Sequence, residues 1–240
     1  MEIFQYPDVV HVRRHGPHGY RNYTSYKPWL RDEFTFQCVY CLCRERWFPD
    51  GETAFSVDHL HPHATTPAYH TDYDNLVYAC CQCNAVRGIT SVPDPTEHAY
   101  GQHLRVWDNG HAVALILIGR ELIEICRLNR PHLVSFRRGI LEVLTVLRQR
   151  RGVHVDALLK TYLGFPLSLP NLAILRPPGG NHKPHGIEHS YYVRQQRGAL
   201  PEIYESRRQG LRQQARMIVV TAIVLAVARS CITANLSVIV

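Results

Sequence analysis

The hydrophobic and polar positions of this chain change their pattern several times, and each change marks an element. Residues 1–35 are rich in Tyr, His, Arg and Pro and show no sustained period, which indicates an irregular basic arm. The stretch RDEFTFQCVYC, residues 31–41, is typical of a short strand that enters a tight turn. The apolar run 54–57 ends in Asp58 and His59, so we expect a strand whose C-terminal end presents polar side chains.

Two later apolar stretches predict further elements. The segment NLVYACCQCNAVRG, residues 75–88, begins apolar and predicts a helix that ends near Gly88, because glycine commonly follows a helix C-terminus. The segment AVALILIG, residues 112–119, is a continuous apolar run that ends in Gly119. A run of this length bounded by glycine favours a buried strand.

A longer helix is predicted after Asn129. Asn129 is a suitable helix cap, and Pro131 fits the first turn of the helix that follows. Apolar residues then recur at helical spacing, and this stripe indicates core or interface packing. The stripe consists of Leu133, Phe136, Ile140, Leu144 and Leu147.

The C-terminal quarter is divided by composition. Residues 177–186, PPGGNHKPHG, form turns and predict a linker. Arginines at 207, 208, 212 and 216 precede the twelve-residue run 217–228, which is almost wholly apolar. A membrane span needs about 20 apolar residues, so this run favours a buried helix or strand. Its arginine-rich flank nevertheless keeps a membrane tail within 217–240 as the less favoured alternative.

Composition and charge narrow the class of partner. Hydrophobic residues make up 45% of the chain and charged residues 20%, which is enough for an ordinary globular core. Lys and Arg exceed Asp and Glu by 27 to 20, giving a net charge of +7. This excess favours a polyanionic partner, and an acidic protein surface would satisfy it as well. Only three of the basic residues are lysines, and the arginine fork suits phosphate groups.

The cysteines indicate a metal site. Eight cysteines in 240 residues are too few for a disulfide scaffold, and the N-terminal residues contain no apolar segment typical of a signal peptide. We therefore expect a reducing, cytoplasmic location, where clustered thiols bind metal. Two Cys-x2-Cys pairs, Cys38 with Cys41 and Cys80 with Cys83, predict a four-thiolate structural zinc site. Registers that use Cys43 or Cys81 leave a one-residue gap, which is a poor chelating geometry.

Further motifs lie between and directly after these two pairs. Between the pairs lie SVDHLHP and DYDNL, and the second pair is followed directly by Asn84 and then, three positions later, by Arg87. This order, Cys-x2-Cys, Asp-His-x2-Pro, Asn-Leu, Cys-x2-Cys-Asn, resembles the zinc-stapled members of the HNH endonuclease family over about residues 30–90. The resemblance implies the ββα-metal fold and hydrolysis of nucleic-acid phosphodiester bonds.

The family's roles transfer to individual residues of this chain. His59 would be the general base, and Asn75 would hold the loop that carries it. Asp58 and Asn84 would bind a catalytic divalent ion, and Arg87 would lie near the phosphate. Oxygen ligands suit Mg²⁺ or Mn²⁺, which would be separate from the zinc. One such site cuts one strand, so cleavage of both strands would need a homodimer or two successive events.

The sequence therefore predicts an α+β protein with an HNH nuclease core, a four-cysteine zinc site and a C-terminal α/β or helical extension. DNA is the expected substrate, and the alternatives are a non-catalytic zinc-stapled nucleic-acid-binding module or a nuclease tethered through its apolar tail. The expected segments are a basic arm at 1–35, the nuclease core at 36–105, a strand–helix extension at 106–165, a Pro/Gly-rich linker at 166–200 and a basic then apolar tail at 201–240.

Overall fold

The computed structural model of the chain describes residues 3–62, 67–150, 152–175 and 185–203. All of them belong to one compact unit, Glu2–Tyr204. Most of the predicted linker 177–186 and the whole apolar tail 217–240 lie outside the described residues. Among the described residues, no helix is long and apolar enough to span a membrane.

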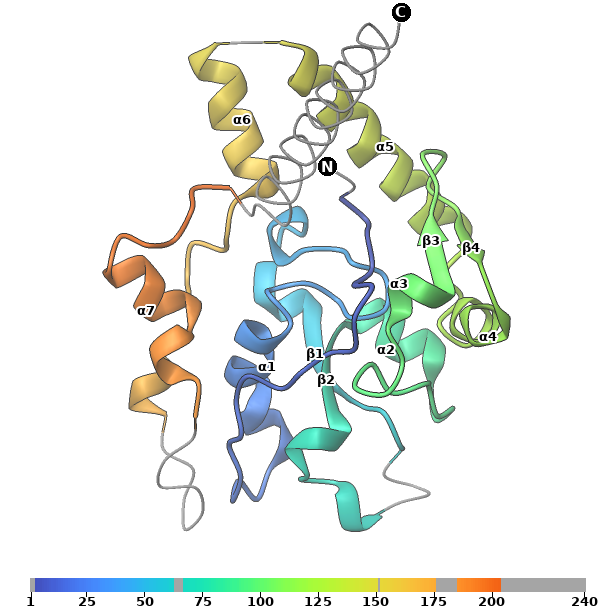
Figure 1. The fold of residues 1–240 in the computed structure, drawn as a ribbon, viewed down its shortest axis with the longest axis vertical. Helices are drawn as coiled ribbons and strands as arrows, with labels where there is room; N and C mark the ends of the chain where they lie inside the picture. The colour runs from blue at the N-terminus through green and yellow to red at the C-terminus, as the bar shows by residue number, and fades with distance from the viewer. Residues whose placement is uncertain (1–2, 63–66, 151, 176–184, 204–240) are drawn as a thin grey trace, which may run out of the picture. The chain divides into compact units, whose positions relative to one another are not determined.

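Helices of 4 to 19 residues and two small hairpins make up the described part of the fold (Figure 1). The α-helices are α1 Lys27–Glu33, α2 Cys81–Arg87, α3 Tyr100–His103, α4 Leu117–Ile125, α5 Pro131–Gln149, α6 Val153–Leu163 and α7 Tyr191–Gln196. The strands are β1 Phe55–His59, β2 Leu76–Cys80, β3 Leu104–Val106 and β4 Ala112–Ala114. The 3-10 turns are η1 Tyr23–Tyr26, η2 Glu45–Trp47, η3 Gly51–Ala54, η4 Pro67–Tyr69, η5 Tyr73–Asn75, η6 Leu172–Ile174 and η7 Ile187–His189. Helices and strands thus mix in the α+β manner that the sequence predicts.

The antiparallel hairpin β1–β2 organises the centre of the fold. Phe55 pairs with Cys80 and His59 with Leu76, so the two strands are paired along their full length. Both α1 and α2 contact this hairpin, and every residue of β2 is buried. A strand that is buried on both faces needs apolar side chains on both, which the sequence LVYAC supplies. The strand predicted to end in Asp58 and His59 is confirmed as β1.

The strand expected ahead of the turn at Cys38–Cys41 is wrong, whereas the turn itself is present. Residues 31–33 instead form the end of α1, and Pro28 lies in the first turn of this helix. The helix buries Trp29 and Leu30 completely, so the final part of the predicted irregular arm is an ordered core element. The chain then turns sharply, because Thr35 and Phe36 both have positive φ angles of 58° and 57°.

The segment 75–88 is a strand followed by a helix rather than a helix throughout. Its apolar half, LVYAC, forms β2, and only the part from Cys81 onward is helical. Cys80 caps α2 by accepting a hydrogen bond from the Cys83 backbone NH. The predicted end of the helix is confirmed at Gly88, whose φ of +61° is unfavourable for residues with a Cβ atom.

The segment 112–119 is also different from the expectation of a buried strand. Only Ala112–Ala114 are in a strand, and α4 starts at Leu117. Three of its apolar side chains, Leu115, Ile116 and Leu117, are 45%, 52% and 67% exposed. Asn129 does not cap the next helix, since its side chain bonds both the NH and the carbonyl of Ala112.

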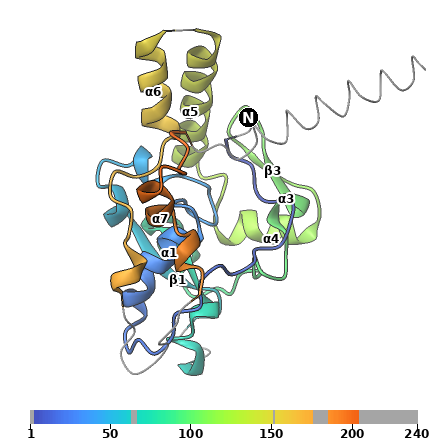
Figure 2. The same ribbon diagram turned by 60° about the vertical axis from the view of Figure 1, so that its left-hand side comes forward.

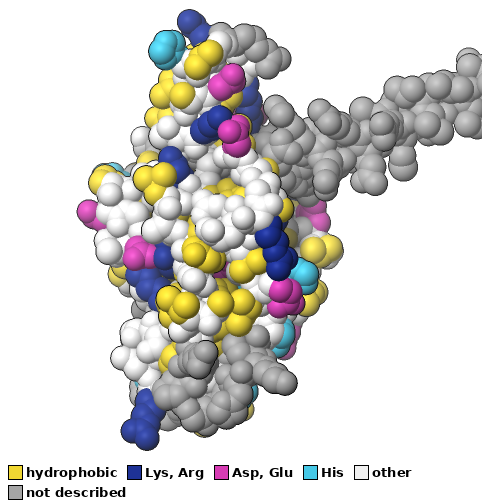
Figure 3. Space-filling model, turned by 90° about the vertical axis from the view of Figure 1, so that its left-hand side faces the viewer, with side chains coloured by type: hydrophobic (Ala, Val, Ile, Leu, Met, Phe, Trp, Pro, Cys, Tyr) yellow, Lys and Arg dark blue, Asp and Glu magenta, His cyan; other side chains and the backbone are white. Residues whose placement is uncertain are grey.

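The helix predicted beyond Asn129 is confirmed as α5. The stripe packs inward: Leu133, Ile140, Leu144 and Leu147 are buried, and Phe136 contacts the rings of Trp47 and Phe48. Helices α5 and α6 contact each other and stand side by side (Figure 2). On the face shown in Figure 3, basic side chains are scattered among acidic and apolar ones and do not form one continuous stripe.

Candidate active site and thiolate cluster

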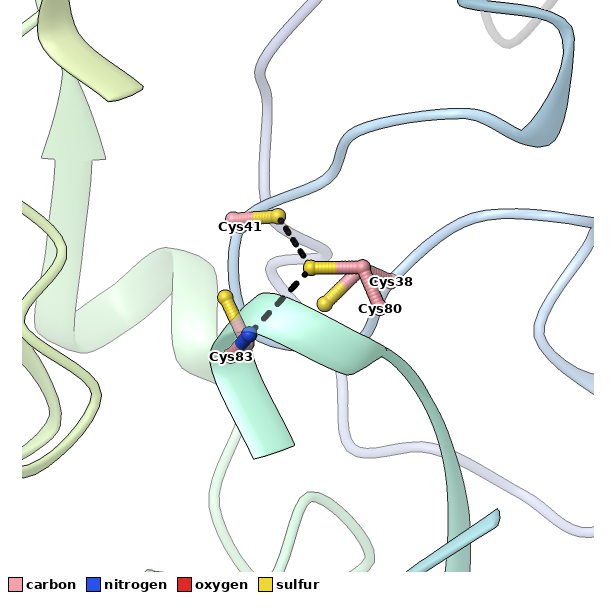
Figure 4. A group of neighbouring side chains, drawn as sticks. All are labelled: Cys38, Cys41, Cys80 and Cys83. Carbon is pink, nitrogen blue, oxygen red and sulfur yellow. Dashed lines mark hydrogen bonds between the residues drawn. The ribbon is translucent and has the colours of Figure 1, made fainter. Parts of the chain in front are cut away.

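Four cysteine sulfurs meet at the junction of β2, α2 and the turn after α1. The Sγ atoms of Cys38, Cys41, Cys80 and Cys83 all lie within 4.8 Å of one another, and all four residues are buried (Figure 4). The Sγ atoms of Cys41 and Cys80 are 3.7 Å apart. A tetrahedral zinc ion with Zn–S bonds of about 2.3 Å has an S···S edge of about 3.8 Å. The cluster therefore fits a structural zinc ion.

The turn between the first two cysteines is built to present both sulfurs. The backbone NH of Leu42 bonds the carbonyl of Cys38, and the NH of Cys38 bonds the carbonyl of Cys43. Leu42 adopts a φ of 62°, a conformation that costs a residue with a side chain about 1 kcal/mol. Cys43 and Cys81 are outside the sulfur group, and the Cys81 side chain is exposed.

The pKa values of the four buried thiols indicate that a cation is needed before all of them can ionise. Burial away from water raises the pKa of the Cys38 and Cys41 thiols well above the ordinary value. The pKa of Cys83 is instead well below the ordinary value, first because of its hydrogen bond with Cys38. Four buried sulfurs become thiolates together only when a metal ion compensates their charge.

Two arginines from the C-terminal part of the unit reach this cluster. Arg130 Nη2 lies 3.3 Å from Cys83 Sγ and donates to it, just before α5 begins. Arg137 is completely buried, and its Nη2 donates to the carbonyl oxygen of Cys41 at 3.4 Å. Helix α5 and its N-cap residue Arg130 are thereby hydrogen-bonded to both halves of the thiolate cluster.

Asp58 has a fully occupied carboxylate. Its Oδ2 accepts from Arg87 Nε at 2.9 Å and from the Tyr40 hydroxyl at 2.8 Å. Its Oδ1 accepts from the backbone NH of His59 at 2.8 Å and from Arg87 Nη2. The side chains of Asp58 and Arg87 are each 3% exposed. The expected metal ligand and the expected phosphate-binding residue are therefore paired with each other.

Asn84 lies on the same face of β1 as Asp58. Its Nδ2 donates to the Ser56 hydroxyl at 3.0 Å and to the Val57 carbonyl at 3.5 Å. Ser56 and Asp58 are two residues apart on one strand, so their side chains share a face, and Asn84 and Arg87 are three apart on α2. Helix α2 thus lies along this face of β1, where the Asn84 amide contacts Ser56 and the Arg87 guanidinium contacts Asp58.

His59 belongs to a separate group of rings. Its Nε2 is 2.9 Å from the carbonyl oxygen of His70. The His59 and His70 rings stack with centroids 5.1 Å apart, and Tyr23 meets both rings edge-on at 4.7 and 4.9 Å. The ring of His59 is therefore held by contacts from the segment after β1 and from η1.

Asn75 joins the two ends of the segment that follows His59. Its Oδ1 accepts from the backbone NH of His61 at 2.8 Å. Its Nδ2 donates to the carbonyl oxygens of His61 and Tyr69 at 3.1 and 3.2 Å. Every polar atom of this buried side chain is in use, so Asn75 fixes the backbone on either side of the residues next to the His59 ring.

Sequence patterns do not indicate four of these contact residues. Tyr40 lies between Cys38 and Cys41, where the pattern Cys-x2-Cys leaves the residue type open. Tyr23 belongs to the segment interpreted as a basic arm, while Arg130 and Arg137 are two of many arginines. These contacts form only when segments that are distant in the chain come together. Cys83 and Arg130, for example, are separated by 47 residues.

The comparison with protein families agrees with this geometry. Residues 38–88 match the model of the HNH endonuclease family, and no curated protein matches the chain. The matched segment begins at the first cysteine of the thiolate cluster and ends at the glycine after α2. It contains the whole β1–β2–α2 unit together with Asp58, His59, Asn75 and Asn84. Residues 38–88 are therefore a domain of the HNH endonuclease family.

Proposed function

We propose that this protein is a metal-dependent endonuclease that hydrolyses phosphodiester bonds in DNA, with His59 as the general base. The observation that carries the proposal is the contact between His59 Nε2 and the carbonyl oxygen of His70. A carbonyl oxygen only accepts hydrogen bonds, so in the neutral imidazole the proton lies on Nε2 and the lone pair on Nδ1. This tautomer can take a proton at Nδ1.

The reaction needs this proton acceptor at one point. A water molecule attacks phosphorus, its proton passes to His59 Nδ1, and the bond from phosphorus to the 3′ oxygen breaks. The leaving oxygen takes a proton from solvent. Asn75 acts as a positioning residue, because its three hydrogen bonds fix the backbone that supports the His59 ring.

Asp58 and Asn84 are the residues that would hold the catalytic ion. Their carboxylate and carboxamide oxygens are hard donors of the kind that Mg²⁺ and Mn²⁺ prefer. In this structure Asp58 is paired with a cationic group, the guanidinium of Arg87. The chemistry of these donors suits a divalent ion, which when bound in place of the guanidinium would stabilise the negative charge of the phosphate in the transition state.

The substrate and setting follow from charge and from the thiols. A net charge of +7 favours a polyanion, and DNA is our choice. The four reduced thiols favour a reducing compartment, the cytoplasm. Because one site cuts one strand, nicking is the expected product of a single chain, and a homodimer would be required for concerted cleavage of both strands.

The same structure favours one second candidate. Arg87 occupies the carboxylate of Asp58, which would otherwise be a ligand of the catalytic ion. This pairing would suit a zinc-stapled module that binds nucleic acid without cutting it. The two candidates differ in a single measurement. Binding to DNA without cleavage under any divalent ion would support the second candidate.

Nicking of supercoiled plasmid tests the leading proposal. Zinc-loaded full-length protein should nick plasmid with Mg²⁺ or Mn²⁺, and His59→Ala should lower the rate by about 10²–10⁴-fold through loss of the base. His61→Ala is the matched control, because this neighbouring side chain is exposed and, among the described residues, only the His61 backbone takes part in hydrogen bonds. An inert wild-type protein, or equal nicking by His59→Ala, would overturn the proposal.

A further inference from the structure

The carboxylate of Asp58 has no acceptor site left for a metal ion in this arrangement. A carboxylate offers about four lone-pair positions. Arg87 fills two of them, the Tyr40 hydroxyl a third and the His59 backbone NH the fourth. A divalent ion also needs a lone pair of each ligand oxygen. One of the four present donors has to leave before Asp58 can bind an ion.

Arg87 is the donor that can leave. The NH of His59 is part of the backbone at the end of β1, and Tyr40 belongs to the turn between two cysteines of the thiolate cluster. Arg87 in contrast has a long side chain on the last residue of α2, and Gly88 follows it. Its other hydrogen bonds to described residues go to the carbonyl oxygens of His59 and Thr90.

We propose that Arg87 is an internal competitor of the catalytic ion: it occupies Asp58 in the ion-free protein and is displaced when the ion binds. This inference rests on the proposed function, since it assumes that Asp58 is a ligand. The released guanidinium would carry a free planar fork at the edge of the same site. A fork of this kind suits the scissile phosphate, so displacement would couple binding of the ion to binding of the substrate.

Measuring the affinity for Mn²⁺ tests the competition without any cleavage reaction. Isothermal titration of zinc-loaded full-length protein should give tighter binding for Arg87→Gln than for wild type, by about tenfold or more, because hydrogen bonds to the charged Asp58 no longer have to be broken. Arg87→Lys should lie between them, since a single ammonium group cannot form the two-pronged contact. Arg138→Gln, which removes an exposed arginine of α5, should bind like wild type.

The lysine variant separates displacement from charge. If Arg87→Lys binds Mn²⁺ as wild type does while Arg87→Gln binds more tightly, the charge alone is responsible and the inference is overturned. Equal or weaker binding by both variants overturns it as well. Should Arg87→Gln fail to fold, Arg87→Lys carries the test, with tighter binding expected.

The variant Asp58→Asn tests the ligand assignment of the proposed function separately from the competition by Arg87. In both the wild-type and the Arg87→Gln background, Asp58→Asn should abolish the Mn²⁺ isotherm. If Mn²⁺ binding persists without Asp58, the ligand assignment is wrong. If binding is lost with Asp58→Asn but is not tightened by Arg87→Gln or Arg87→Lys, only the competition is wrong.

Discussion

The guanidinium of Arg87 and the carboxylate of Asp58 form a buried ion pair that joins the end of α2 to the end of β1. The helix that bears Cys83 and Asn84 is thereby fixed to the strand that bears His59. At the start of α2, Cys80 and Cys83 meet Cys38 and Cys41, so a zinc ion bound by the four sulfurs would join this end of the helix to the turn after α1.

Removal of Arg87 alone should destabilise the protein. Arg87→Ala leaves the Asp58 carboxylate buried without a counter-charge, and loss of one partner of a buried pair costs about 3–5 kcal/mol of unfolding free energy. Chemical denaturation of zinc-loaded protein measures the change. The double variant Asp58→Asn with Arg87→Gln should recover part of the loss, because no charge remains buried. Arg138→Ala, at an exposed position, should lower the free energy of unfolding by about 0.5 kcal/mol or less. An equally small loss for Arg87→Ala would contradict the expectation.

The sequence is sufficient to locate β1, the end of α2 and the four clustered cysteines. The apolar run 54–57 with its polar end predicts β1, and Gly88 predicts the end of α2, because both signals are local. The spacing of the cysteines likewise identifies the four that meet, since a two-residue gap is the one that lets both sulfurs face one ion. These features depend on residues that are close in the chain.

Other features depend on contacts that no local pattern contains. The segment 31–41 has strand-like composition, yet burial of Trp29 and Leu30 against the hairpin makes its first part helical. The run 112–119 is apolar but largely exposed, so the prediction of a buried strand fails there. The pairing of Arg87 with Asp58 across 29 residues requires knowing which face of β1 meets α2. Only the assembled fold provides that information.

The cysteine register leads to a sharp prediction about zinc. One zinc per chain should be retained after purification of wild type and of Cys81→Ser, because Cys81 is exposed and outside the sulfur group. Cys80→Ser and Cys83→Ser should each lose the ion, since a three-thiolate site lacks a ligand. Metal analysis by mass spectrometry gives the stoichiometry. Equal loss of zinc in Cys81→Ser would show that the register is wrong.

Arg130 should slow the release of zinc. Its hydrogen bond to Cys83 Sγ partly offsets the negative charge that four thiolates bring to one ion. Without that donor the zinc affinity should fall by about 10–100-fold. Competition with a coloured chelator measures zinc transfer for wild type, Arg130→Ala and Arg130→Lys, and lysine should restore part of the effect. Arg138→Ala is the control, and transfer from Arg130→Ala at the wild-type rate would refute the role.

Asn75 should be sensitive to the loss of its amide group. Asn75→Asp has nearly the same shape, but a carboxylate cannot donate to the carbonyl oxygens of His61 and Tyr69. Each buried group left without a partner costs about 1–3 kcal/mol, so both Asn75→Asp and Asn75→Ala should destabilise the protein. Thermal unfolding gives the loss, and plasmid nicking should fall as the support of His59 loosens. Asn109→Asp, which changes an exposed turn residue, should behave like wild type.

Glu33 should make stability depend on pH in the acid range. Burial by itself raises the pKa of this carboxyl, but hydrogen bonds from His11 and the Arg14 backbone, with the charges of His11 and His15, outweigh it and lower the pKa to about 2. The group binds its proton more readily in the unfolded chain, where its pKa is the ordinary 4.5. Its contribution is therefore complete above pH 4.5 and is lost as the pH falls toward 2.

The size of this effect is roughly 3 kcal/mol over the whole window, by the conversion of pKa differences into free energy. Denaturation curves recorded from neutral pH downward should show wild type losing that much more stability than Glu33→Gln, which cannot ionise. Glu121→Gln, an exposed control on α4, should follow the wild-type pH dependence. Parallel curves for wild type and Glu33→Gln would mean that the carboxylate does not anchor the segment His11–His15 to α1, despite its bonds to the backbone NH groups of Arg14 and His15 at 2.8 and 3.0 Å.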